Sequence, residues 1–439
     1  MRVLWVGDAV AKTGFAKVTH AMVPRLIAAG WDVHVLGSNY PGDPHPFPYP
    51  IWPARSGGDA WGVGRVEALA KKLQPDVVVV QGDPWNVREF LIPLHGLCPV
   101  VGYMPLDSQN VPACRDLNGR PGKEGYDGLA HAVWYTEFAR AEAHTEWSGY
   151  TGSSAVVGLG IDASQFRARP RAEALAKLGL TSLPAHAFIV GNVNRNMARK
   201  RLDLTIFAFA RWWEQAGKPA HAYLYLHASQ LDTGPNLLQL AKRVGLTGRV
   251  IITNKTMRPG EGIPELDMTA VYSLFDVQVS TTQGEGWGLT TMEGMACGVP
   301  QIVPAYSALA EWPTGAVQHV EAAIPTVTVR GVNTIGMAPD VADVADALQA
   351  FYADPGLRLA YGRLGRGRVT EARFDWDGLG RALAAELQGV VTRGPRADPP
   401  AATVPADAEA ERAPDPEVPI APPQAVRSKT GLVELARSR

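Results

Sequence analysis

The sequence has few cysteines and no long apolar run. Its 439 residues include three cysteines, Cys98, Cys114 and Cys297. These lack CxxC spacing, so we expect reduced, packed thiols and neither a zinc site nor a disulfide framework. The longest apolar runs have the length of a strand, as in 77–80, which predicts that no segment spans a membrane.

The chain also lacks an excess of charge of either sign. Lys and Arg number 42 against 43 Asp and Glu, which gives a formal net charge of −1. No global attraction therefore draws it to nucleic acid or to an anionic membrane, and any polyanion site has to be local. The opening residues, MRVLWVGDA, contain one basic residue and no cleavage-site pattern, so they predict a first strand and no signal peptide. We expect a cytoplasmic protein.

What the sequence does contain is a repeated alternation of two patterns. Apolar β-branched runs alternate with segments of helical periodicity, which is typical of strand–helix–strand units around a parallel sheet. Strands are expected at 3–6, 33–36, 77–80 and 100–104, and then at 188–193, 222–226, 250–253, 277–280 and 301–303. We predict an α/β fold with two Rossmann-like doubly wound domains, a boundary within 163–187, and a ligand cleft between the sheets.

Proline, with 35 residues, gathers in two segments. The run 40–53 mixes proline with aromatic residues and predicts an ordered surface loop able to flank a site. The segment from 393 to about 428 is rich in Ala, Pro, Glu and Asp, cannot bury enough apolar surface, and is expected to be disordered. The last residues predict either a frayed terminus or a short basic helix.

The stretch 280–300, STTQGEGWGLTTMEGMACGVP, carries the most chemical information. It follows an expected strand, has glycines at alternate positions from 284 to 288, and then takes on helical periodicity. Glycine allows close approach to a ligand, and the free amides at a helix start suit phosphate or sugar oxygens. Glu285 and Glu293 suit the vicinal diols of a ribose or a hexose. Taken singly, each also fits an ordinary solvated or helix-start charge.

A basic cluster, GNVNRNMARKRLD at 191–203, follows another expected strand. Arg195 and Lys200 lie five positions apart, so a guanidinium fork and an ammonium are able to converge on a diphosphate. The alternative is a basic surface at a helix start. Arg199 and Arg201 are expected to be solvated.

Four other features are ambiguous. The loop KTGFA around Gly14 lacks the dinucleotide fingerprint, which counts against an NAD enzyme, and Gly14 suits either phosphate approach or a capping turn. Asp107 in GYMPLDSQ is a candidate acceptor-side carboxylate or a turn cap. His227 is either a donor contact or a satisfied core histidine. The triplet 375–377, Asp-Trp-Asp, spells a metal-binding DxD, but we interpret it as the start of a late helix.

The stretch 280–300 resembles the signature of retaining glycosyltransferases of family 4 (glycosyl transferases group 1), in which E-x7-E within a GEGFGLxxxEAMA-like run binds the sugar nucleotide. Glu285 and Glu293 match the two acids, with Trp287 where Phe is common. The basic cluster resembles the GRLxxxKG segment of this family, whose Arg and Lys contact the donor phosphates, with Arg195 and Lys200 in the matching places. The Gly14 loop resembles the TGFGRVT-like loop of some members. The histidine often found near position 107 is missing here.

The resemblance implies a GT-B architecture. Its expected parts are an acceptor-side domain at 1–170, a nucleotide-sugar-binding domain at 184–372, a terminal helix at 373–392 that packs back on the first domain, and a disordered tail at 393–439. No metal is required, because basic side chains and helix-start amides stand in for metal charge at the leaving diphosphate. No cofactor is expected beyond the donor substrate.

The implied function is transfer of a sugar, with retention, from a nucleotide-diphosphate sugar to a hydroxyl of unknown identity. The expected donor-binding residues are Gly14, Arg195, Lys200, Glu285, Gly286, Trp287, Gly288, Leu289, Thr290 and Glu293. The expected catalytic residues are Arg195, Lys200, Glu285 and Asp107. Alternatives are a sugar-nucleotide epimerase or phosphorylase on the same fold, or a non-catalytic sugar-nucleotide-binding protein. Members with TGFxxVT occur in bacteriophages, so a modified DNA base is an alternative acceptor, although the net charge does not indicate nucleic acid.

Overall fold

The computed structural model describes residues 1–10, 13–55, 57–110, 128–146, 152–254, 265–327 and 334–394. The described residues belong to one compact unit, Met1–Arg396. Cys114 and the predicted disordered tail from 395 onward lie outside the described residues.

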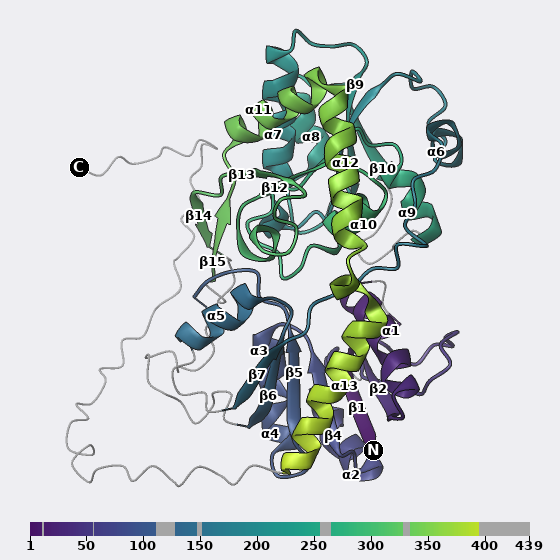
Figure 1. Cartoon of the computed structure of the whole chain (residues 1–439), viewed down its shortest axis with the longest axis vertical. Helices are drawn as coiled ribbons and strands as arrows, with labels where there is room; N and C mark the ends of the chain where they lie inside the picture. The colour runs from purple at the N-terminus through teal and green to yellow at the C-terminus, as the bar shows by residue number, and fades with distance from the viewer. Residues whose placement is uncertain are drawn as a thin grey trace, which may run out of the picture. The chain divides into compact units, whose positions relative to one another are not determined.

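A seven-stranded parallel sheet forms the core of the first lobe (Figure 1). Its strand order is β3-β2-β1-β4-β5-β6-β7, and every neighbouring pair is parallel. The strands are β1 (Arg2–Asp8), β2 (Asp32–Ser38), β3 (Ile51–Pro53), β4 (Val77–Gln81), β5 (Val100–Met104), β6 (Leu129–Trp134) and β7 (Ser153–Val156). The helices are α1 (Gly14–Ala28), α2 (Val63–Leu73), α3 (Pro84–Glu89), α4 (Leu91–Leu94) and α5 (Glu137–Glu146).

A six-stranded parallel sheet forms the core of the second lobe, with the order β10-β9-β8-β11-β12-β13. The strands are β8 (Phe188–Val193), β9 (Ala222–Ser229), β10 (Val250–Asn254), β11 (Val277–Val279), β12 (Gln301–Pro304) and β13 (Gln318–Val320). Two further strands, β14 (Ile324–Val327) and β15 (Ile335–Ala338), follow β13 in the sequence and form a separate antiparallel pair. The helical elements are α6 (Arg171–Lys177), η1 (Ala198–Lys200), α7 (Leu202–Gln215), α8 (Leu237–Arg243), α9 (Glu265–Tyr272), α10 (Leu289–Ala296), η2 (Ser307–Ala310), α11 (Val341–Ala353), α12 (Pro355–Val369), η3 (Ala372–Phe374) and α13 (Trp376–Arg393).

Burial on both faces explains why the strands are continuous apolar runs. In β4, Val77, Val78 and Val79 are fully buried, and their alternate side chains enter the cores on the two sides of the sheet. These strands confirm the predicted α/β class with two Rossmann-like sheets. In each sheet the strand order reverses next to the first strand, between β1 and β4 and between β8 and β11. Ligands bind outside the carboxyl ends of strands at such reversals.

The last described helix, α13, runs along α1 of the first lobe (Figure 1). Asp375 caps it by accepting a hydrogen bond from the Gly378 amide at 2.9 Å, and Asp377 pairs with Arg25 of α1 at 2.8 Å. The Asp-Trp-Asp triplet is thus engaged in capping and packing. Among the described helices, none is both long enough and apolar enough to cross a membrane.

Candidate active site

The loop after β11 leads directly into α10, at the point where the strand order of the second sheet reverses. Gly288 precedes the helix with φ of +92°, in the left-handed region that favours glycine. No side chain caps this helix, so the N–H groups of Leu289 and Thr290 point to where an oxygen-rich ligand would be bound.

Glu285 in this loop forms an ion pair with Lys200 from η1. Both side chains are almost enclosed, with exposed fractions of 9% for Glu285 and 12% for Lys200. Burial lowers the pKa of Lys200 and the Arg199 charge lowers it further, while Glu285 acts in the opposite direction. The structure therefore brings together two of the residues that the sequence predicts for the donor site.

Arg199 links the two lobes and was expected to be solvated. Its Nη1 lies 3.0 Å from Asp107 Oδ2 in the first lobe and 3.9 Å from Glu285 Oε2 in the second. Burial opposes its charge, but Asp107, Glu285 and Asp83 outweigh this effect and raise the Arg199 pKa. The prediction that Arg199 is solvated was wrong. Arg199 and Arg201 both adjoin Lys200, and the sequence does not reveal which of the two points into the cleft.

Glu293, one turn into α10, is held by residues from both lobes. Its Oε1 accepts from Lys17 Nζ of α1 at 2.5 Å, and its Oε2 accepts from the Tyr272 hydroxyl of α9 at 2.6 Å. The Glu293 side chain is 5% exposed. Burial lowers the pKa of the nearby His227 to about 4, and the Lys17 charge adds to this effect. Lys17 and Tyr272 are site residues that the sequence reasoning missed.

Arg195 lies apart from the Lys200–Glu285 pair in its contacts. Its guanidinium binds both carboxylate oxygens of Asp232, at 2.6 and 3.1 Å, and its side chain is half-exposed. The hydrogen bonds that Arg195 donates to Asp232 raise the Arg195 pKa. The guanidinium is therefore fixed in orientation by Asp232 in the loop after β9.

The glycines before α10 allow the two lobes to approach each other closely. A Cβ on Gly284 would lie 1.7 Å from the Asp107 carbonyl oxygen, and one on Gly286 would lie 2.4 Å from Pro105 Cβ. A Cβ on Gly14 would lie 3.6 Å from Leu289 Cδ1, so the first-lobe loop faces the start of α10. These glycines were expected to make room for a ligand. In the structure, Gly284 and Gly286 also make room for the opposite lobe.

Trp287 is packed inside the protein. Its ring stacks on Trp312, with centroids 5.5 Å apart, and meets Phe374 edge-on at 6.1 Å. A Cβ on Gly158 would lie 2.6 Å from this indole. Trp287 thus packs the loop against Trp312 and Phe374. Among the described residues, its ring contacts are with aromatic side chains and not with the Lys200–Glu285 or Lys17–Glu293 pair.

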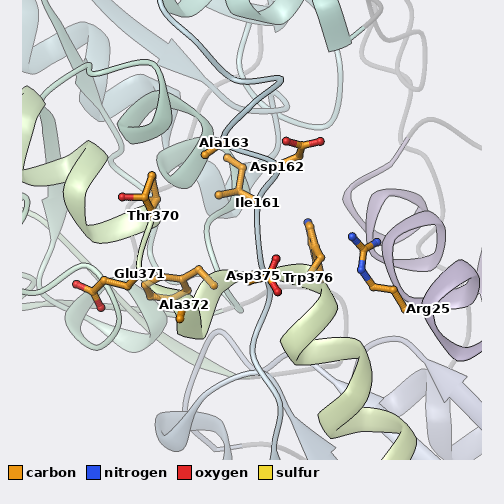
Figure 2. Close-up of a pocket in the computed structure, with 11 residues that line it drawn as sticks. Arg25, Ile161, Asp162, Ala163, Thr370, Glu371, Ala372, Asp375 and Trp376 are labelled. Carbon is orange, nitrogen blue, oxygen red and sulfur yellow. The ribbon is translucent and has the colours of Figure 1, made fainter. Parts of the chain in front are cut away.

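A cavity of about 430 Å³ lies where the chain passes between the lobes. Figure 2 shows Ile161 and Asp162 of the first crossing above Asp375 and Trp376 of the second, with Arg25 reaching in from α1. None of the predicted site residues lines it. Asp162, in its wall, accepts hydrogen bonds from Ser164 and Gln165.

The site is thus an interlobe cluster of Glu285, Lys200, Arg199, Asp107 and the separate pair Glu293–Lys17. Carboxylates able to accept hydroxyl hydrogen bonds alternate with cations able to neutralise a diphosphate. Within the described ranges, no group of three His, Cys, Asp or Glu side chains is placed to hold a metal ion.

Residues 185–354 match the family described as Glycosyl transferases group 1. The matched region includes Arg195, Lys200, Glu285 and Glu293. The chain contains a group 1 glycosyltransferase domain. The predicted family is confirmed, and within this domain the Lys200–Glu285 pair and Glu293 belong to the matched segment, whereas Lys17, Asp107 and Gly14 belong to the first lobe.

Relatives of this group 1 glycosyltransferase domain cover part of the chain. The D-inositol 3-phosphate glycosyltransferase of Salinispora arenicola is 28% identical over 231 residues, which are 51% of this chain and 46% of that protein. The protein of the same name from Mycolicibacterium vanbaalenii is 30% identical over 256 residues, 54% of this chain and 50% of that protein. The chain spans about half the length of the curated relatives it matches.

Similar solved structures cover both lobes. Sucrose-phosphate synthase from Thermosynechococcus elongatus has a TM-score of 0.68 at 18% identity, covering 89% of this chain and 99% of that one. Anabaena HepE in complex with UDP and glucose has a TM-score of 0.62 at 16% identity, covering 89% and 100%. At these identities the likeness concerns the fold alone, and it confirms the predicted GT-B architecture.

Proposed function

We propose that the protein transfers a sugar from a UDP-sugar to a hydroxyl acceptor with retention of configuration. The observation that carries the proposal is the pairing of Glu285 with Lys200 and of Glu293 with Lys17 around the start of α10. The group 1 domain supports transfer, and retention is a property of the family that it matches. UDP is favoured because HepE was solved with UDP and glucose, and an E. coli protein of similar fold with UDP-2-fluoro glucose.

The chemistry follows from the charges in the cleft. Lys200 and Arg195 offset the negative charge that builds on the departing diphosphate, and the amides of Leu289 and Thr290 add to this stabilisation. Glu285 accepts hydrogen bonds from the transferred sugar, and Glu293 accepts them from the ribose. The ribose diol takes the place of the Lys17 ammonium on Glu293, which frees that cation for the phosphates. Removing one such group typically costs about 3 to 4 kcal/mol in the barrier.

Incubation with radiolabelled UDP-sugars tests this function. Wild-type protein is expected to release UDP from one of UDP-glucose, UDP-galactose or UDP-N-acetylglucosamine, with acceptor alcohols or with water. Glu293→Ala and Lys200→Ala should each slow release at least about tenfold, or about 1.4 kcal/mol, because each removes a donor contact. Lys218→Ala is the matched control. Lys218 follows the end of α7, and its side chain is 54% exposed, so this variant should leave the rate unchanged.

Other outcomes point elsewhere. Conversion of the sugar while it stays attached to the nucleotide would show an epimerase. Binding of UDP without release from any donor would show a non-catalytic binding protein. Wild-type rates in both variants would overturn the assignment of the site.

A further inference from the structure

His227 lies at the carboxyl end of β9, in the second lobe. Its neighbour on β8 is Val193, two residues before Arg195 of the basic cluster. Successive side chains of a strand point to opposite faces of the sheet, so His227 shares a face with Tyr225. The histidine is half-buried, whereas Tyr225 is buried. His227 therefore stands at the edge of the sheet where ligands bind, close in register to a residue predicted to hold the donor phosphates.

Packed aromatic rings connect this face of the sheet with Glu293. Three rings pack in series, with centroids 5.5 and 6.2 Å apart: Tyr225, Phe275 and Tyr272. The Tyr272 hydroxyl donates to Glu293 at 2.6 Å. Lys17, the second partner of Glu293, is near enough to His227 for its charge to act on the imidazole. His227 and Glu293 therefore belong to one part of the site.

A chain of hydrogen bonds fixes the proton of the His227 ring. The Thr253 hydroxyl of β10 lies 2.8 Å from His227 Nδ1 and donates to the Tyr225 hydroxyl at 3.1 Å. A threonine hydroxyl has one proton, so with that proton directed to Tyr225 it accepts from Nδ1–H. The neutral ring then has a lone pair on Nε2. Among the residues that the structure describes, none forms a hydrogen bond or ion pair with Nε2.

The imidazole of His227 is neutral at physiological pH. Burial is the larger cause, and together with the Lys17 charge it lowers the pKa of His227 to about 4. Nε2 is thus an acceptor that suits a ligand group with a proton to donate. The nucleoside part of UDP has two kinds of donor, the ribose hydroxyls and the N–H of the base. The proposed function assigns the ribose hydroxyls to Glu293, which leaves the base for His227.

We propose that His227 Nε2 accepts a hydrogen bond from N3–H of the uracil of UDP and thereby selects UDP over CDP, an inference that rests on the proposed function. In UDP, N1 is bonded to the ribose, so N3–H is the one N–H group of the base. In CDP, N3 has a lone pair instead, and two lone pairs would face each other at His227. A site built to accept from a ligand discriminates against an analogue without the donor, because the site's acceptor then lacks a partner. Thr253 is a positioning residue that keeps the His227 proton on Nδ1.

The test is calorimetric titration of the full chain with UDP and with CDP at neutral pH. Wild-type protein should bind UDP at least about tenfold more tightly than CDP. His227→Phe keeps an aromatic ring and removes the acceptor, so its UDP affinity should fall to the level of CDP, with no loss of CDP affinity. Thr253→Val removes the acceptor of Nδ1–H and allows the proton to move to Nε2. That tautomer donates to N3 of cytosine, so this variant should bind CDP more tightly than the wild type does.

The control variant is His221→Phe. His221 directly precedes the first residue of β9, at the opposite edge of the sheet from the site, and its replacement should keep the preference for UDP. Equal affinities of the wild type for UDP and CDP would overturn the inference without any variant. Equal weakening of both nucleotides in His227→Phe would overturn it as well, because it would show a packing role. Absence of UDP binding by the wild type would instead overturn the proposed function.

Discussion

Four carboxylates of the cleft have the same chemistry and different surroundings. Glu285 and Glu293 each form an ion pair with a lysine, and Asp107 forms one with Arg199. Asp83 has burial without a partner, and its pKa rises to about 7. Environment therefore divides the acids into three that are held in ion pairs and one whose pKa is raised by burial.

The raised pKa of Asp83 predicts a pH-dependent cost to stability. The folded protein keeps this proton up to about pH 7, whereas the unfolded chain releases it near the ordinary value of 3.8. The unfolded state thus binds fewer protons between these values, and stability falls as pH rises through this window. Asp83→Asn has no charge to bury and lacks this loss. The difference in free energy of unfolding between Asp83→Asn and wild type should therefore grow in favour of the variant from about pH 4 to pH 7 and stay constant above that.

Thermal unfolding of both proteins from pH 4 to pH 9 measures this difference. Asp107→Asn is the comparison, because Asp107 has an ion-pair partner that is lost with its charge. A difference between wild type and Asp83→Asn that does not change with pH would contradict the account of Asp83.

Some site residues could be predicted from sequence and others could not. Glu285, Glu293 and Lys200 stand in motifs whose spacing is local, so their roles follow from short stretches of chain. Lys17 pairs with a residue 276 positions away, and no local pattern indicates that contact. Arg199 and Arg201 look alike in sequence, but one turns into the cleft and the other pairs with Asp203 at its own helix start.

The loop between β11 and α10 depends on its small residues. Gly284 passes so close to the Asp107 backbone that a methyl group has no room, and Gly286 does the same at Pro105. These contacts seat Glu285 beside Arg199 of the same lobe and Asp107 of the other. The loop is therefore shaped by the interface between the lobes.

Gly284→Ala tests this role of the loop. Its Cβ would lie 1.7 Å from the Asp107 carbonyl oxygen, so the loop has to move away from the first lobe. We expect UDP release to fall at least tenfold and the melting temperature to decrease. Gly367→Ala in α12 is the matched control, because a Cβ there meets nothing within 4 Å; it should keep full activity and gain about 0.5 to 1 kcal/mol of helix stability. Equal behaviour of the two variants would contradict the interface role.

Long, strongly patterned elements were predicted well. The strands at 100–104 and 188–193 have the expected bounds, because each contains a run of β-branched and other apolar residues. The strands β3, β6, β7, β13, β14 and β15 were not predicted. β3 lies at the end of the proline-rich run, and β6 and β7 contain histidine, alanine and serine, so neither shows the β-branched pattern used to find strands.

On the scale of the whole molecule, the described lobes meet through polar contacts around the site. Gln109 of the first lobe exchanges two backbone hydrogen bonds, each of 2.8 Å, with Ile335 of β15. Glu311 of the second lobe accepts from the amides of Glu137 and Phe138 at the start of α5, at 3.1 and 2.9 Å. With Lys17–Glu293 and Arg199–Asp107, these contacts join the two lobes around the candidate site.

Calorimetric titration of UDP tests the central claim most directly. Wild-type protein should bind UDP, and Glu293→Gln should bind it at least tenfold more weakly. The carboxylate has two oxygens that accept hydrogen bonds from the two ribose hydroxyls, whereas the amide has only one. Glu214→Gln, at a side chain that is 66% exposed, should match the wild type. UDP binding that is absent in the wild type, or equally tight in Glu293→Gln, would contradict a donor site built around Glu293 and Lys200.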